Sequence, residues 1–140
     1  MTWEIFETSD LAACHALRRE VFIVEQGVAE ADEMDDLDDQ AVHVLATVND
    51  VPVGTTRLLQ VGTTGKIGRI CVVKSQRGTG LGAALVRDGI ERIIAKGGMN
   101  RIMLGAQEHA IGFYEKLGFT ICGPTYDDAG IPHRDMEMLL

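Results

Sequence analysis

One stretch of the chain combines the residue types that bind phosphate groups. Lys74–Arg87 reads KSQRGTGLGAALVR, with three glycines at every second position between an apolar run and a helical pattern. A glycine-rich turn that leads into a helix presents free backbone N–H groups and the positive end of the helix dipole. The glycines allow close approach to the backbone, and arginine adds a cation that can bind two phosphate oxygens. We therefore expect a phosphate-containing cofactor to contact Arg77, Gly78, Thr79, Gly80, Leu81, Gly82 and Ala83.

Three phosphate-binding motifs compete for this stretch. A Walker-type loop ends in Gly-Lys-Ser or Gly-Lys-Thr, whereas this one ends in Leu-Gly-Ala, so that motif is excluded. Gly78, Gly80 and Ala83 satisfy the permissive dinucleotide pattern, but that motif belongs in a parallel strand–helix–strand unit. The third motif is Arg/Gln-x-x-Gly-x-Gly/Ala, which Arg77, Gly80 and Gly82 match. The simplest alternative is a glycine-rich turn that binds nothing.

Hydrophobic periodicity predicts the elements that position this loop. From Ala41, the β-rich runs VHVLATV, VGTTRLLQV and KIGRICVV are separated by Asn-Asp and Gly-Thr-Thr-Gly turn signals and predict an antiparallel meander. Such a meander argues against the dinucleotide motif. After the loop, Leu81 to Lys96 carries a broad apolar stripe that ends at Gly97-Gly98 and predicts a helix.

The rest of the chain completes a β-α-β-β-β-α-β-α-β-β order. A first strand is predicted over residues 2–8 and a helix over 11–22. A short buried strand is predicted over 101–104, a second amphipathic helix over 107–117, and final strands near 119–122 and 133–139. The loop predicted between the final strands contains Gly123, Pro124, Gly130 and Pro132.

Composition limits the partners and the compartment. The chain has 140 residues, about one domain's length, and 21 acidic against 13 basic residues give a net charge of −8. That charge argues against a general binder of nucleic acid or anionic membranes. Cys14, Cys71 and Cys122 are far apart and odd in number, which predicts buried free thiols rather than a disulfide framework or metal site. No signal peptide or membrane-spanning run is recognisable, so we expect a cytoplasmic protein.

Taken together, the motifs resemble those of the GNAT superfamily of N-acetyltransferases. IGRICVVKSQRGTGLGAALV is similar to that family's fourth strand, pyrophosphate loop and third helix, and AIGFYEKLGF to its late helix with a tyrosine. REVFIVEQ, the acidic segment, LGAQ and AGIPHRDMEM further resemble a small bacterial subgroup without an assigned substrate. The resemblance implies a single domain over residues 1–140 with an α/β (α+β) fold. It also implies a mixed, largely antiparallel sheet of about six or seven strands, flanked by about four helices.

The resemblance implies acetyl-CoA as the acetyl donor. Its pantetheine arm would pair with the backbone of Ile70, Cys71 and Val72, where this strand splays from its neighbour, and the N–H of Val72 or Cys71 would stabilise the oxyanion. Phe113 and Tyr114 complete the implied contacts, with Tyr114 as the acid that protonates the leaving thiolate. From the residues alone, Tyr114 is better explained as a core residue of an amphipathic helix, and the resemblance is what favours the catalytic role.

A neutral amine attacks the thioester directly in this family, so a base must take the amine's proton. The carboxylates and imidazoles that could do so are Glu25, Glu108, His109 and His133, and a water chain could replace any of them. His133 follows the glycine-proline loop, where it could meet a substrate, whereas His43 in an alternating strand is predicted to be structural. Cys71 has no identifiable histidine partner and is interpreted as a small buried apolar residue.

Charged residues elsewhere are predicted to be solvated. Residues 30–39 hold seven carboxylates in ten positions, which favours an exposed loop or short helix. Calcium binding would be a sharper interpretation, but the EF-hand's central glycine and terminal glutamate are missing. Surface arginines that are solvated or salt-bridged are predicted at Arg18, Arg19, Arg57 and Arg69. At Gly105, related sequences of the subgroup often have an asparagine whose amide could bond the cofactor.

The leading functional hypothesis is acetyl transfer from acetyl-CoA to a primary amine of a small acceptor. One alternative is a CoA or acyl-CoA binding module without transferase activity. Another is acyl transfer to a different acceptor, because LRREVFIVEQ faintly resembles autoinducer synthases, although those chains are longer. Edge strands near the C-terminus favour a homodimer.

Overall fold

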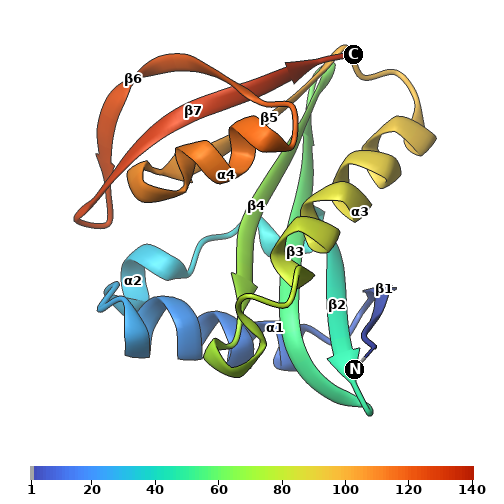
Figure 1. Cartoon of the computed structure of the whole chain (residues 1–140), viewed down its shortest axis with the longest axis vertical. Helices are drawn as coiled ribbons and strands as arrows, with labels where there is room; N and C mark the ends of the chain where they lie inside the picture. The colour runs from blue at the N-terminus through green and yellow to red at the C-terminus, as the bar shows by residue number, and fades with distance from the viewer. Residues whose placement is uncertain (1) are drawn as a thin grey trace.

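A twisted seven-stranded sheet organises residues 2–140, the part of the chain that the computed structural model describes (Figure 1). The strands are β1 (Glu4–Thr8), β2 (Val42–Val48), β3 (Val51–Val61), β4 (Thr64–Val72), β5 (Arg101–Gln107), β6 (Thr120–Asp128) and β7 (Ile131–Leu139). They lie in the order β1-β2-β3-β4-β5-β7-β6. The predicted order of elements is confirmed, and the largely antiparallel pairing with it.

The helical segments are short except for one. They are α1 (Leu11–Arg18), the π-helix η1 (Arg19–Glu25), α2 (Glu30–Glu33), α3 (Leu81–Lys96), α4 (Ile111–Lys116) and the 3-10 turns η2 (Asp38–Gln40), η3 (Lys74–Gln76) and η4 (Glu108–Ala110). The helix α3 has the bounds that its apolar stripe predicted.

The sheet between α1 and α3 is buried on both faces. Val44 and Ala46 of β2 belong to the large core that α3 covers, whereas Leu45 between them packs with Leu17 and Cys71 against α1. Alternating strand residues point to opposite faces, so this run of apolar residues serves two cores. Asn49 and Asp50 join β2 to β3 with positive φ angles of 51° and 64°, a turn whose twist matches that of the strands.

The sheet separates into two halves at the one parallel pairing found among residues 2–140. β4 and β5 pair over Thr64–Lys66 and Arg101–Met103, and beyond these residues the two strands diverge. Figure 1 shows β4 running down between α1 and α3 while β5, β7 and β6 turn away with α4. Backbone N–H and C=O groups of β4 are therefore left without a strand partner on the β5 side over residues 67–72, within the described structure.

Three predicted boundaries were wrong for identifiable reasons. The first helix continues as a π-helix to Glu25, where Gln26 N–H bonds the carbonyl of Val21. The strand from Arg101 extends to Gln107 because β7 pairs along its whole length. The predicted loop with Pro124 and Pro132 is instead the β6–β7 hairpin, whose turn lies at Ala129-Gly130. β6 is an edge strand with a bulge, and both features tolerate proline.

Within residues 2–140, no helix is long and apolar enough to cross a membrane. The same residues contain no group of three or more metal-ligating side chains arranged to hold an ion.

Candidate active site

A cavity of about 690 Å³ opens where β4 and β5 diverge. The backbone of β4, the end of β5, α4 and the β6–β7 hairpin line it, and η1 and α2 contribute from the other side. A larger hollow of about 820 Å³ lies at the C-terminal end of α3, but it contains none of the predicted site residues.

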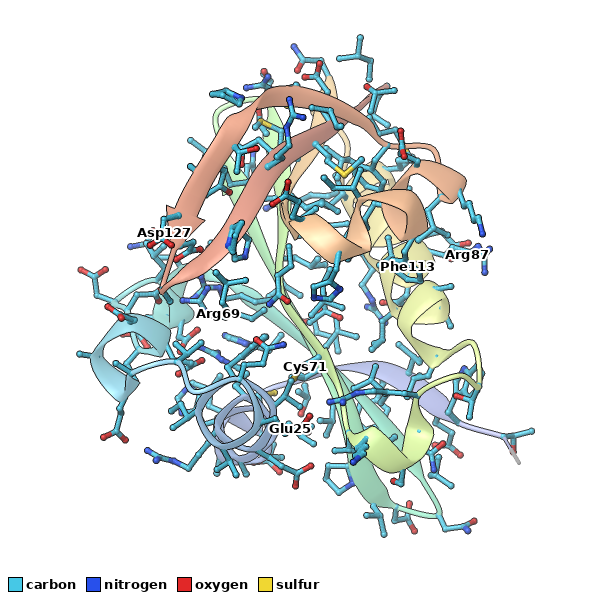
Figure 2. All side chains as sticks on the ribbon, turned by 60° about the vertical axis from the view of Figure 1, so that its left-hand side comes forward. Glu25, Arg69, Cys71, Arg87, Phe113 and Asp127 are labelled. Atoms are coloured by element: carbon cyan, nitrogen blue, oxygen red, sulfur yellow. The ribbon has the colours of Figure 1, made fainter. Side chains whose placement is uncertain are left out.

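The cavity gathers half of the predicted site residues from distant parts of the sequence. Those that line it are Ile70, Cys71, Val72, Arg77, His109, Phe113, Tyr114 and His133. Figure 2 shows Cys71 in the middle of the diverging strand, between Glu25 on one side and Phe113 on the other. Glu25 lies outside the lining and is ion-paired with Arg77. The glycines of the loop also lie outside it, and of the three only Gly82 has Phe113 beside its Cα.

The glycine loop leaves the start of α3 open. Gly80 is the N-cap residue, its φ of 93° is one that favours glycine, and no side chain caps the helix. A β-carbon at Gly82 would lie 3.7 Å from the ring of Phe113, so the first turn of α3 faces α4. The free N–H groups at the start of this sixteen-residue helix are thus available to an anion beside the cavity.

Arg77, at the start of the glycine loop, contacts both β4 and η1. Its Nε donates to the carbonyl of Val72 at 3.1 Å, and its Nη2 lies 2.8 Å from Glu25 Oε2. Because Glu25 is ion-paired with Arg77, its carboxylate is less available as a base than the sequence indicated. Glu108 also lies outside the cavity lining, while His109 Nε2 bonds the side-chain oxygen of Gln107 at 2.8 Å.

Tyr114 lies on the cavity wall against two phenylalanines. Its ring makes edge-to-face contacts with Phe113 and Phe119, at centroid distances of 5.1 and 6.2 Å. Burial raises the pKa of its hydroxyl to about 12, so the group stays protonated at neutral pH. Among the described residues, this hydroxyl has no hydrogen-bond partner, which leaves it free to donate to a bound molecule.

His133 faces the cavity with a defined tautomer. It is 9% exposed, and its Nδ1–H donates to the carbonyl of Ile131 at 2.7 Å, which leaves Nε2 as the proton acceptor of the neutral ring. The ring of Tyr126 stacks on it at 5.8 Å, and the Tyr126 hydroxyl donates to Asp135 at 2.8 Å. A β-carbon at Gly105 would lie 2.6 Å from that hydroxyl, so glycine at this position makes room for the tyrosine.

Sequence reasoning missed Tyr126 and Asp135. Strand alternation in β7 places Asp135 on the same face as His133, and that signal was available once the strand was recognised. Tyr126 was hidden because Gly123 and Pro124 were interpreted as a loop. In the structure Tyr126 pairs directly opposite His133 across the hairpin.

The prediction of an exposed loop or short helix holds for most of the acidic segment, which contains the short helix α2, but Glu33 is buried, and two of the arginines predicted at the surface are buried as well. Arg18 is 1% exposed and Arg57 is 5% exposed, because the acidic segment folds over both side chains. Arg18 donates to Glu33 at 2.5 Å and to Asp38 at 3.0 Å, and Arg57 forks onto Asp35 at 2.7 and 3.0 Å. Most of the segment's carboxylates thus stay exposed, while ion pairs with the two buried arginines hold part of the segment against the protein.

The other two arginines differ in position. Arg19 is an exposed arginine that pairs with Glu30, as predicted. Arg69 is a cavity residue, and its Nη2 donates to the carbonyl of Glu33 at 3.0 Å and to Asp35 at 3.3 Å. Figure 2 shows Arg69 between Cys71 and the hairpin tip that carries Asp127, whereas Arg87 lies on the far side of the molecule on α3.

The remaining predictions concern cysteines and His43. Cys71 is buried, and that burial raises the pKa of its thiol to about 12, so it is poorly suited to act as a nucleophile. Cys14 is also a buried free thiol, but Cys122 is exposed on β6, which corrects that prediction. His43 is buried and donates to the carbonyl of Asp38 at 2.9 Å, as expected of a structural histidine.

Comparison with known proteins adds a family match. Residues 8–140 match the family model described as an acetyltransferase (GNAT) domain. YyaT, an uncharacterised protein of Bacillus subtilis (strain 168), is 43% identical over 128 residues, which are 89% of this chain and 86% of that protein. YjcF, an uncharacterised N-acetyltransferase of the same strain, is 37% identical over 121 residues, which are 86% of each protein.

Solved structures share the fold over the whole chain. The crystal structure of Escherichia coli ElaA aligns over 98% of both chains with a TM-score of 0.85 and 30% identity. A GNAT family acetyltransferase from Elizabethkingia anophelis, solved with acetyl-CoA bound, covers 99% of this chain and 98% of its own with a TM-score of 0.73 at 20% identity. These similarities confirm the predicted arrangement of sheet and helices.

Proposed function

The chain belongs to the acetyltransferase (GNAT) domain family, and on that premise we propose that it transfers the acetyl group of acetyl-CoA directly to a primary amine of a small acceptor. Residues 1–140 would act as one domain. The proposal rests on one observation: three structural features adjoin one another. They are the open start of α3, the unpaired edge of β4, and the cavity with Tyr114 and His133.

Acetyl-CoA fits this arrangement along its length. The N–H groups at Gly80–Ala83 and the α3 dipole would hold the pyrophosphate, and the free edge of β4 at Ile70–Val72 would pair with the pantetheine amides. Phe113 would pack against the arm. Bound acetyl-CoA in a distant member with the same fold supports the assignment.

The chemistry needs one bond made, one broken and two proton transfers. The amine nitrogen would attack the thioester carbonyl carbon, with the oxyanion held by the N–H of Val72 or Cys71. Loss of the C–S bond would release the CoA thiolate, which would take the proton of the Tyr114 hydroxyl. His133 Nε2 would take the proton of the attacking amine, in preference to Glu25, because Glu25 is ion-paired outside the cavity lining.

The test combines binding with turnover. Calorimetry with acetyl-CoA, CoA and NADH should show binding of both CoA species and no binding of NADH. A broad panel of small amines, with a thiol reagent to detect released CoA, should then show amine-dependent CoA release. Tight CoA binding without turnover of any amine would instead indicate a binding module, and no CoA binding would contradict the proposal altogether.

A further inference from the structure

A partly buried set of ion pairs connects the acidic segment to the bulge in β4. We call residues 30–39 the acidic strap. Within it, Asp35 contacts both Arg57 of β3 and Arg69 of β4, and Glu33 contacts both Arg18 of α1 and Arg69. The strap therefore joins three elements on the α1 side of the sheet, and Arg69 is its contact nearest to the reacting centre.

Arg69 has a backbone conformation that arginine rarely adopts. Its φ is +49°, in the left-handed region that favours glycine. The register shows why: Arg57 pairs with Gly68 and Thr55 with Cys71, so two steps on β3 oppose three on β4 and one residue is extra. A bulge of this kind ordinarily has a glycine in the left-handed position.

The bulge sets the direction of the next residues. Before it, Ile67 points into the core under α3, and after it Cys71 points into the core against α1. The unpaired backbone of Ile70–Val72, where the oxyanion donors are proposed, follows directly. Any relaxation of Arg69 out of its positive φ would rotate these N–H groups relative to the cavity.

Stability alone is a poor explanation for the ion pairs. Arg18 Nη2, Arg57 Nε and Arg69 Nε are buried without a hydrogen-bond partner among the described residues. Buried ion pairs recover little of the free energy lost on desolvation when some of their donors stay unpaired. A set of charges that is costly and incompletely bonded is better explained by the geometry that it imposes.

We propose that Arg69 is a positioning residue, held at positive φ by Glu33 and Asp35 of the acidic strap so that the bulge aims the N–H group of Val72 at the thioester. This inference rests on the proposed function for its reaction. It assigns the strap a role in catalysis through the backbone, with no contact between the strap and the acetyl group.

Two substitutions at Arg69 separate this role from a direct one. R69A removes the guanidinium that Glu33 and Asp35 hold, while alanine still loses free energy at positive φ. The kcat should therefore fall about tenfold or more, and the Kd for CoA should change by less than about threefold. R69G also removes the guanidinium but accepts positive φ without strain, so kcat should return to within about threefold of the parent. R19A is the matched control, since Arg19 pairs with Glu30 of the strap but does not contact β4, and it should leave kcat unchanged.

Asp35→Asn supplies the second arm of the experiment. It should lower kcat in the parent. In R69G it should have little further effect, because glycine at position 69 adopts positive φ without side-chain contacts to hold it there. Equal loss of kcat in folded R69A and R69G would overturn the proposal, since a guanidinium that contacts the acceptor would give that result. An unchanged kcat in R69A would overturn it as well.

An acceptor-independent readout distinguishes this inference from the proposed function. In ¹⁵N-labelled protein, exchange of CoA for acetyl-CoA should shift the amide resonances of Cys71 and Val72, and R69A but not R69G should abolish the shift. If the parent binds acetyl-CoA and acetylates no amine, the proposed function fails while this comparison still decides the role of Arg69.

Discussion

At the residue scale, Tyr114 is set up to donate a proton rather than to lose one in advance. With its pKa raised to about 12, the hydroxyl is protonated throughout the range in which the protein is expected to work. We expect Y114F to lower kcat about 100-fold without a change in the Kd for CoA, as for loss of a general acid. Y126F is the matched control, because it removes another tyrosine hydroxyl from the same cavity. Steady-state kinetics in which the two variants behave alike would contradict the assignment.

His133 and Glu25 can be separated at the same scale. H133N should lower kcat about 100-fold because it removes the imidazole nitrogen that is proposed to accept the amine's proton. E25Q should leave kcat within about threefold, because Glu25 is already paired with Arg77. Single-turnover rates with saturating acetyl-CoA would measure both effects on the chemical step. If E25Q lowered kcat more than H133N, the base would be Glu25 of η1 rather than His133.

At the element scale, the first turn of α3 should be the main determinant of CoA affinity. G82D places a carboxylate where pyrophosphate is proposed to bind, and it should weaken CoA binding at least tenfold. The same carboxylate favours the helix N-terminus, so the fold should survive. G82A is the control, since its β-carbon would meet Phe113 at an ordinary 3.7 Å. Calorimetry that shows equal affinities for G82D and G82A would exclude this position for the pyrophosphate.

The acidic strap should also respond to pH. Burial would raise the pKa of Asp38, but bonds from Arg18, His15 and Arg57 outweigh it and hold the pKa well below the ordinary 3.8. A carboxyl with a lowered pKa stabilises the fold above pH 3.8, and this contribution is lost as pH falls below that value. D38N should lower the free energy of unfolding by about 1–3 kcal/mol at neutral pH.

Urea denaturation at several pH values would check that expectation. The difference between parent and D38N should shrink progressively below about pH 4, because the unfolded parent then binds a proton at Asp38 that the folded state, with its lowered pKa, does not yet bind. D39N changes the adjacent, exposed carboxylate and should show no such pH-dependent difference. A pH-independent difference for D38N would mean that packing, rather than charge, accounts for its effect.

How far the sequence predicts these elements depends on the range of the forces that form them. The bounds of α3 and the turn at Asn49-Asp50 follow from local periodicity and turn chemistry, so they could be read directly. The β6–β7 hairpin could not, because pairing with β5 overrides the local signal of Pro124 and Pro132. The strap's ion pairs depend on Arg18 and Arg57, which are distant in sequence, and no local pattern reveals them.

At the scale of the whole molecule, the two halves of the sheet are held together by a short seam. Three residue pairs join β4 to β5, and Gly65 opposite Ile102 is the middle one. Ile93 of α3 packs so close that a β-carbon at Gly65 would lie 2.6 Å from its Cγ2. The glycine thus lets α3 fasten the seam from the core side, and the cavity opens where the seam ends.

G65A should therefore destabilise the protein by about 1–3 kcal/mol, because Ile93 must shift within a close-packed core. G68A on the same strand is the control: a β-carbon there meets nothing within 4 Å, and its φ is not positive, so stability should hold or rise slightly. I93A in the G65A background should cost less than I93A alone, since the overlap has been removed. If urea denaturation shows additive effects for these two substitutions, Ile93 does not set the requirement for glycine, and the seam must tolerate a wider separation of α3 than this packing indicates.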